Sequence, residues 1–270
     1  MNVSARGAGL RRGLLPVNQL DAVSFLKLGG RFTVYGCFEG NEISKRHAER
    51  IKELLAHRLW HELSTRNLCP PPDGSLRIIT SALGKPAVMA GNRIGPPISF
   101  SRSAGSILAA ACASGPQIGL DSASPAEFPH GYPVWKICYP HEWSDALRIT
   151  GGDPHKAASL LWSVKESFAK ALGSGFHLFD ALSVLAEYTS KDNETLCFKL
   201  WLNDKAREKI CTFSSLSQCR QRNGRHFDLP ERENPLFSNI EYTPGMAFAR
   251  YVKQKFAWLT VTFIDTPFSP

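Results

Sequence analysis

Two long helical patterns, each followed by short strand-like segments, constrain the fold of this 270-residue chain more than any other feature. The first covers residues 44–63, where apolar side chains recur at helical spacing. The second covers residues 155–172 and ends at Gly173 and Gly175. The strand-like segments are residues 76–80, 98–102, 107–113 and 117–121 after the first helix, and residues 181–188, 195–202, 246–252 and 256–264 after the second. This repeated order predicts an α+β fold of two similar halves, divided into residues 1–116 and 117–270.

Three further segments complete this outline. Residues 31–38 are predicted to form a first strand, ahead of the first helix. Residues 122–140 are rich in proline and aromatic residues and are predicted to form a long loop. Residues 214–245 are polar, basic and irregular, and no element is predicted there.

Composition narrows the possible partners and the compartment. The net charge of +8 favours an anionic partner such as a nucleic acid, an anionic lipid, a nucleotide or an acidic protein. Residues 107–113 form the longest run of small apolar side chains, which is too short to span a bilayer and suits a buried strand. None of the seven cysteines forms a CxxC pair, so we expect free thiols and a cytoplasmic location.

One carboxylate stands at the end of a predicted strand. In Ile118-Gly119-Leu120-Asp121, an apolar strand delivers Asp121 to its own carboxyl end, where a rigid support meets solvent. A turn-forming aspartate explains the same pattern.

A second acidic side chain lies on the second helix, in the segment Trp162-Ser-Val-Lys165-Glu166-Ser-Phe-Ala-Lys170. Glu166 and Lys170 are four residues apart and share a helix face. An ordinary surface salt bridge has the same spacing. Together with Asp121, however, the pair indicates a metal and phosphate site, because two carboxylates can hold one Mg²⁺ and lysines balance phosphate charge.

Two shorter segments carry cations suited to phosphate. Arg102 stands among hydroxyl groups in Ser99-Phe-Ser101-Arg102-Ser, and Lys85 is presented by the turn Leu-Gly-Lys85-Pro86. A solvated edge strand and an unspecific turn are the alternative readings.

Taken in order, these four segments resemble the Sfp-type 4′-phosphopantetheinyl transferases. That family carries Gly-Lys-Pro, a Ser-His-Ser strand, Gly-x-Asp-x-Glu and Trp-x-x-Lys-Glu-x-x-x-Lys, and the last motif matches completely here. The resemblance covers residues 44–188. Two positions depart from the pattern: Arg102 replaces the histidine, and Ala123 replaces the second acid of Gly-x-Asp-x-Glu. Glu127 is another candidate for the missing ligand.

The resemblance implies a pseudo-dimer of two α+β halves with the active site between them. Its implied reaction moves the phosphopantetheinyl group from coenzyme A to a serine of an apo acyl or peptidyl carrier protein, in polyketide or nonribosomal peptide biosynthesis, by a monomeric enzyme. Asp121 and Glu166 would hold Mg²⁺, or Mn²⁺, and Asp121, Glu166 and Lys170 would be catalytic. The residues implied to bind coenzyme A are Lys85, Pro86, Ser101, Arg102, Lys165, Lys170, Arg46 and Arg50.

Competing functions have weaker support. A nucleic-acid-binding module would rest on the basic stretch at residues 220–226, and no recognised motif accompanies it. A zinc site would rest on His57 and His61, without a third ligand. The motif Gly-x-Ser-x-Gly is absent, so the sequence gives no support for a serine hydrolase. A weakened relative that binds carrier proteins without efficient transfer is the remaining alternative, and we expect neither a nucleic-acid nor a membrane partner.

Overall fold

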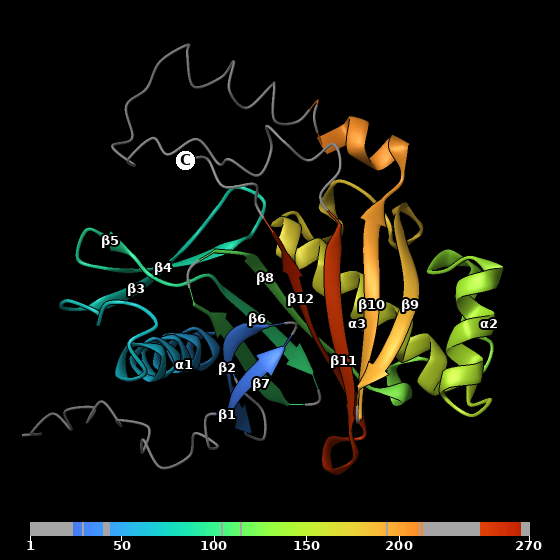
Figure 1. The fold of residues 1–270 in the computed structure, drawn as a ribbon, viewed down its shortest axis with the longest axis horizontal. Coiled ribbons are helices and arrows are strands. Elements are labelled where there is room, and N and C mark those ends of the chain that lie inside the picture. The colour runs from blue at the N-terminus through green and yellow to red at the C-terminus, as the bar shows by residue number, and fades with distance from the viewer. Residues whose placement is uncertain are drawn as a thin grey trace, which may run out of the picture.

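A computed structural model describes residues 24–28, 30–39, 44–103, 105–113, 115–192, 194–210, 212 and 244–265. Within these residues the architecture is mixed α+β, as the sequence predicts (Figure 1). Almost all of residues 214–245 lies outside the described part, as does the basic stretch at 220–226.

The first sheet has four antiparallel strands in the order β1-β2-β7-β6. Their bounds are Ser24–Leu28, Arg31–Glu39, Ser106–Cys112 and Ile98–Ser103 in that order. Helix α1, Lys45–Thr65, begins where the Ser44 side chain accepts a hydrogen bond from the His47 backbone N–H, and it packs against β2 and β7. A small sheet of β3 (Leu76–Thr80), β4 (Pro86–Ala90) and β5 (Arg93–Ile94) lies beside them (Figure 1).

The second sheet has five antiparallel strands in the order β8-β12-β11-β10-β9. Their bounds are Gln117–Ala123, Ala257–Ile264, Gly245–Val252, Thr195–Leu202 and Val184–Asp192 in that order. Helix α3, Pro154–Leu172, packs along β8 and β12, and helix α2, Pro140–Ile149, packs on α3 (Figure 1). The Asp153 side chain caps the start of α3, and Gly173 ends it in the left-handed conformation.

The two sheets pack face to face through β7, which is buried along its whole length. Ile107, Ala109 and Ala111 belong to the core under α1. Leu108 and Ala110 belong to the core shared with Ile118, Leu120 and the strand β12. Since side chains alternate along a strand, β7 serves one core on each face, and the expected buried strand is confirmed.

The long loop expected at residues 122–140 contains two short 3₁₀ helices, η2 (Pro125–Glu127) and η3 (Val134–Lys136), and it leads into α2, which the sequence did not predict. Pro140 occupies the first turn of α2, where proline is well tolerated. None of the helices described here has the length and hydrophobicity to cross a bilayer. None of the five cysteines in the described part of the chain forms a disulfide.

Candidate active site

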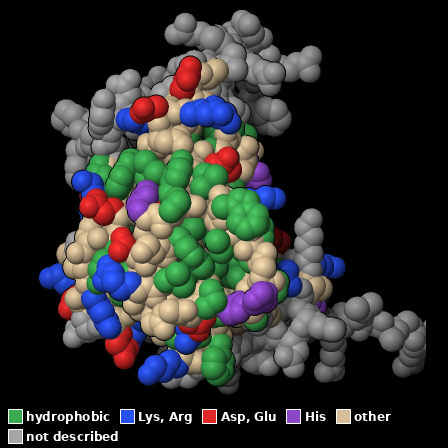
Figure 2. All heavy atoms as spheres, turned by 90° about the vertical axis from the view of Figure 1, so that its right-hand side faces the viewer, with side chains coloured by type: hydrophobic (Ala, Val, Ile, Leu, Met, Phe, Trp, Pro, Cys, Tyr) green, Lys and Arg blue, Asp and Glu red, His purple; other side chains and the backbone are tan. Residues whose placement is uncertain are grey.

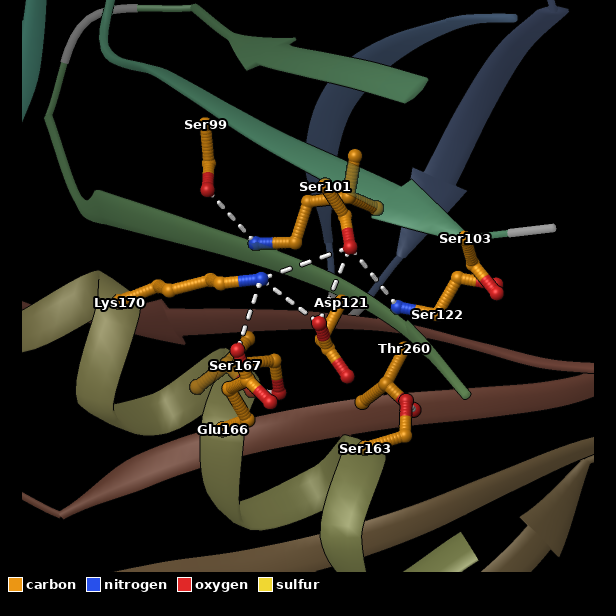
Figure 3. Close-up of polar contacts among 12 residues, drawn as sticks. Ser99, Ser101, Ser103, Asp121, Ser122, Ser163, Glu166, Ser167, Lys170 and Thr260 are labelled. Carbon is orange, nitrogen blue, oxygen red and sulfur yellow. Dashed lines mark hydrogen bonds and ion pairs between the residues drawn. The ribbon is translucent and has the colours of Figure 1, made fainter. Parts of the chain in front are cut away.

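Two edge strands, β6 and β8, meet side by side at the candidate site (Figure 3). They are joined by serine side chains: the Ser99 hydroxyl accepts a hydrogen bond from the Leu120 backbone N–H at 2.9 Å, and the Ser101 hydroxyl accepts one from the Ser122 N–H at 3.2 Å. The matching order of these pairs means that the strands run in the same direction. Asp121, between the two anchored residues of β8, is therefore fixed in place.

Asp121 points into the space between β6, β8 and α3, and it is almost completely buried, with 2% of its surface exposed. Its Oδ1 accepts hydrogen bonds from Ser101 Oγ at 3.0 Å and from Lys170 Nζ at 2.6 Å. Its Oδ2 is also buried and finds no hydrogen-bond partner among the described residues. One oxygen of this carboxylate is thus committed to the protein, and the other is available to a ligand.

Lys170 joins the two acids (Figure 3). Its ammonium lies 2.6 Å from Asp121 Oδ1 and 3.3 Å from Glu166 Oε1, and it also donates to Ser101 Oγ at 3.4 Å. Asp121 and Glu166, which the sequence analysis expects to hold a divalent ion, thus both contact the Lys170 ammonium in the fold. The Glu166 side chain keeps 26% of its surface exposed, so a reactant can reach it.

Burial and neighbouring charges shift the pKa values of Asp121 and Lys170. Burial raises the pKa of Asp121 to about 6, and the nearby Lys170 ammonium opposes this rise. Burial by itself would lower the pKa of Lys170, but the carboxylates of Asp121 and Glu166 raise it above its ordinary value. A buried carboxylate with a raised pKa next to a lysine is typical of functional sites.

The donor set fits a hard divalent cation. A buried carboxylate oxygen left without a partner in the described structure and a partly exposed second carboxylate are the ligands that Mg²⁺ prefers, with water completing its shell. No group of three or more His, Cys, Asp or Glu side chains suited to a metal occurs in the described part of the chain. His57 and His61 therefore gain no third ligand there, and the zinc reading is not supported.

Lys165 lies away from this cluster, contrary to the role that the resemblance implies. Its side chain is fully buried, and its ammonium lies 2.8 Å from Glu142 Oε2 of α2. Neighbouring residues on a helix point about 100° apart, so Lys165 faces α2 while Glu166 faces the site. The other oxygen of Glu142 accepts the Ala186 backbone N–H at 2.7 Å, which completes a buried link between α2, α3 and β9.

The other residues expected to bind coenzyme A lie in four different places. Ser101 is buried at Asp121 rather than open to a nucleotide, whereas Arg102 is exposed on the opposite side of β6. Lys85 is partly buried and its ammonium donates to the Ala171 carbonyl at the end of α3, at 2.9 Å; Pro86, the next residue, begins β4. Arg46 and Arg50 are exposed on α1.

A third acidic ligand could come from position 123, where the family pattern has an acid, or from Glu127, and the two positions differ in their surroundings. Ala123 is completely buried, in a core with Phe128 and Leu161, and it contributes no oxygen. Glu127 Oε1 accepts hydrogen bonds from the Ser124 backbone N–H and from Ser103 Oγ, both at 3.0 Å, so it caps η2. Within the described structure the carboxylates at the site are Asp121 and Glu166.

Part of the chain is similar to a known protein family. Residues 117–224 match the family model of the 4′-phosphopantetheinyl transferase superfamily, and Asp121, Glu166 and Lys170 lie in the matched segment. No curated protein matches the chain. The likeness to the 4′-phosphopantetheinyl transferase superfamily thus extends over residues 117–224.

Proposed function

We propose that this chain transfers the 4′-phosphopantetheinyl group of coenzyme A to a serine of an apo acyl or peptidyl carrier protein and releases 3′,5′-ADP. The observation that carries the proposal is the buried Asp121 Oδ2, left without a partner in the described structure beside Glu166 and Lys170. Burying a carboxylate oxygen without a hydrogen-bond partner costs folding free energy, so its presence indicates that a ligand binds there.

In the proposed reaction, Glu166 takes the proton of the carrier serine, directly or through one water. Its partial exposure allows a hydroxyl to approach within hydrogen-bonding distance. The serine oxygen forms a bond to the pantetheine-side phosphorus, and the bond from that phosphorus to the bridging pyrophosphate oxygen breaks. The electron pair leaves with 3′,5′-ADP, whose growing negative charge the Lys170 ammonium stabilises.

Asp121 and Glu166 are the residues that would hold Mg²⁺, or Mn²⁺ in its place. When bound, the ion would neutralise pyrophosphate charge during phosphoryl transfer. Ser101 fixes the orientation of Asp121 through Oδ1 and so leaves Oδ2 for the ion.

We place the nucleotide of coenzyme A between the two halves, residues 1–116 and 117–270. The support is the meeting of β6 with β8 and the contact of Lys85 with the end of α3. Lys85, Pro86, Arg102, Arg46 and Arg50 are the proposed contacts of the nucleotide end. Lys165 is assigned instead to the buried pair with Glu142, which holds α3 against α2.

The carrier is proposed to dock on the side of the molecule where α2 lies. Hydrophobic side chains gather on that face (Figure 2), and Trp143 and Leu147 of α2 stay partly exposed. Trp162, in the same apolar cluster, precedes Glu166 by one helical turn. A carrier of the polyketide or nonribosomal peptide class, being acidic, would also be attracted by the net charge of +8.

The test is a transfer assay. Coenzyme A, Mg²⁺ and a panel of apo carrier proteins are incubated with the chain, and intact-mass spectrometry follows the gain of the phosphopantetheinyl arm. Each carrier is paired with its serine-to-alanine variant as the control. Absence of the arm from every carrier would reject the proposal.

The second candidate, a weakened relative that binds carriers without efficient transfer, is favoured by Ala123, which supplies no metal ligand. In the same assay it predicts carrier binding, measured by calorimetry, without a mass change.

A further inference from the structure

The Lys170 ammonium lies between Asp121 and Glu166, the two carboxylates proposed to hold the metal (Figure 3). A lysine ammonium has three N–H donors, and three acceptors surround this one: Asp121 Oδ1, Glu166 Oε1 and Ser101 Oγ. In the described arrangement Lys170 is therefore itself the cation that joins the two acids.

A divalent ion at the free oxygen of Asp121 would meet this positive charge. Asp121 and Glu166 together carry two negative charges, and Lys170 cancels one of them, so a single net negative charge remains for the ion. Two charges about 5 Å apart repel strongly enough, even in water, to change a binding constant about tenfold when one of them is divalent. This repulsion matters more here because Asp121 is buried, where charges are screened less than in water. Ala123 also supplies no carboxylate that could offset it.

Lys170 is able to leave this position. Its side chain keeps 24% of its surface exposed, and its four-carbon stem is flexible. A phosphate oxygen beside the site would offer the ammonium an alternative anionic partner. If the Lys170 ammonium moved to that partner, Asp121 Oδ1 and Glu166 Oε1 would no longer pair with it and could bind the metal.

We propose that Lys170 couples the two ligands of the site: in the ligand-free protein it opposes the divalent ion, and a bound phosphate anion draws it away and so strengthens metal binding. This inference rests on the proposed function, because it takes the anion to be the pyrophosphate side of coenzyme A. Binding free energies are reciprocal, so the ion strengthens anion binding by the same factor.

The experiment measures Mn²⁺ binding by the electron paramagnetic resonance signal of the free ion, with and without 3′,5′-ADP as the anion. Wild type is compared with Lys170→Gln and Lys170→Met, which remove the charge, and with Lys170→Arg, which keeps it. Lys156→Gln is the matched control, since Lys156 lies on the same helix about 21 Å away and pairs with Asp153.

Without nucleotide, Lys170→Gln and Lys170→Met should bind Mn²⁺ about tenfold tighter than wild type, while Lys170→Arg and Lys156→Gln stay close to wild type. The nucleotide should tighten Mn²⁺ binding by a larger factor in wild type than in the two uncharged variants. Circular dichroism checks that each variant is folded. Two uncharged variants are used so that the test still stands if one of them does not fold.

Equal or weaker Mn²⁺ binding by both uncharged variants would overturn the inference, as would the same nucleotide factor in wild type and variants, or no Mn²⁺ binding at all. The transfer assay on the wild-type protein is read separately. Transfer without the Mn²⁺ effect rejects the coupling and keeps the function. The Mn²⁺ effect without transfer keeps the coupling and rejects the function.

Discussion

Gly119 of β8 and Ser167 of α3 approach so closely that a Cβ atom on the glycine would lie 1.8 Å from the Ser167 carbonyl oxygen. The helix is held at this distance by hydroxyl pairs with β12, Ser163 with Thr260 at 2.8 Å and Ser167 with Thr262 at 2.6 Å. Asp121 and Lys170 meet because the helix lies this close to the strand. The glycine of Ile-Gly-Leu-Asp is thus a packing requirement of the site.

Gly119→Ala should therefore push α3 away from β8. We expect a loss of unfolding free energy of about 3 kcal/mol or more, at or above the usual range for overpacking, measured by urea unfolding. Gly131→Ala is the control, because Gly131 has a positive φ but open space around its Cβ position. Gly119 itself does not have a positive φ, so a loss in Gly119→Ala no larger than in Gly131→Ala would contradict the close contact with the helix.

Glu166→Gln should lower the rate constant of transfer by about 10²- to 10⁴-fold, the usual contribution of a general base. The fold should be preserved because the side chain is partly exposed. The measurement is single-turnover labelling of a carrier protein, with circular dichroism alongside. Labelling at the wild-type rate would mean that a group other than Glu166 accepts the proton of the carrier serine.

Lys165→Met should destabilise the protein by about 3–5 kcal/mol, since it leaves the Glu142 carboxylate buried without its cation. Adding Glu142→Gln should recover a large part of that loss by removing the negative charge, and a double-mutant cycle in urea measures the recovery. Lys156→Met, which breaks the more exposed pair with Asp153, should cost less than about 1 kcal/mol. Equal costs for the two lysines would contradict the buried link.

Ala123→Glu should place a carboxylate on the same face of β8 as Asp121, two residues away. We expect a lower melting temperature without metal, because Ala123 is completely buried, and a larger stabilisation by Mg²⁺ than in wild type. Thermal unfolding across a Mg²⁺ titration gives both quantities. The same Mg²⁺ response in both proteins would show that position 123 does not face the ion.

Lys85 should make stability depend on pH. Burial lowers the pKa of Lys85 to about 7 from its ordinary value of 10.5, so between these values the unfolded chain holds a proton that the folded chain lacks. The free energy of unfolding of the wild type, relative to Lys85→Met, should therefore rise from about pH 7 to about pH 9.5. Urea unfolding at both pH values measures this, and the exposed Lys199→Met is the control.

The sequence predicted the regular elements well where a pattern was long or was bounded by turn residues. Helix α1 was expected at residues 44–63 and is Lys45–Thr65, and strand β3 has the expected bounds, Leu76–Thr80. Helix α2 was missed because proline was taken as part of a loop. Yet Pro140 at the first turn and Glu142 at the third helical position are a start signal that the sequence does contain.

Asp121, Glu166 and Lys170 were predicted as site residues from local motifs, and the structure brings the three side chains together. Lys165 was predicted to bind coenzyme A with them, and the structure instead pairs it with Glu142, because a motif gives residues in order and does not say which way each one faces. The buried role of Ser101 and the partner Glu142 depend on contacts 20 and 23 residues away in sequence, which no local pattern reports.

The serine bridges between β6 and β8 also set a lower limit on the size of a functional fragment. A chain cut at residue 117 would keep the family-matched segment but lose Ser99 and Ser101, so the amides of Leu120 and Ser122 would face water along an open strand. Such an unprotected edge invites pairing with another copy and aggregation. The segment that matches the family model is therefore expected to depend on the residues before it in two ways: they cover its open strand, and Ser101 among them orients the Asp121 carboxylate.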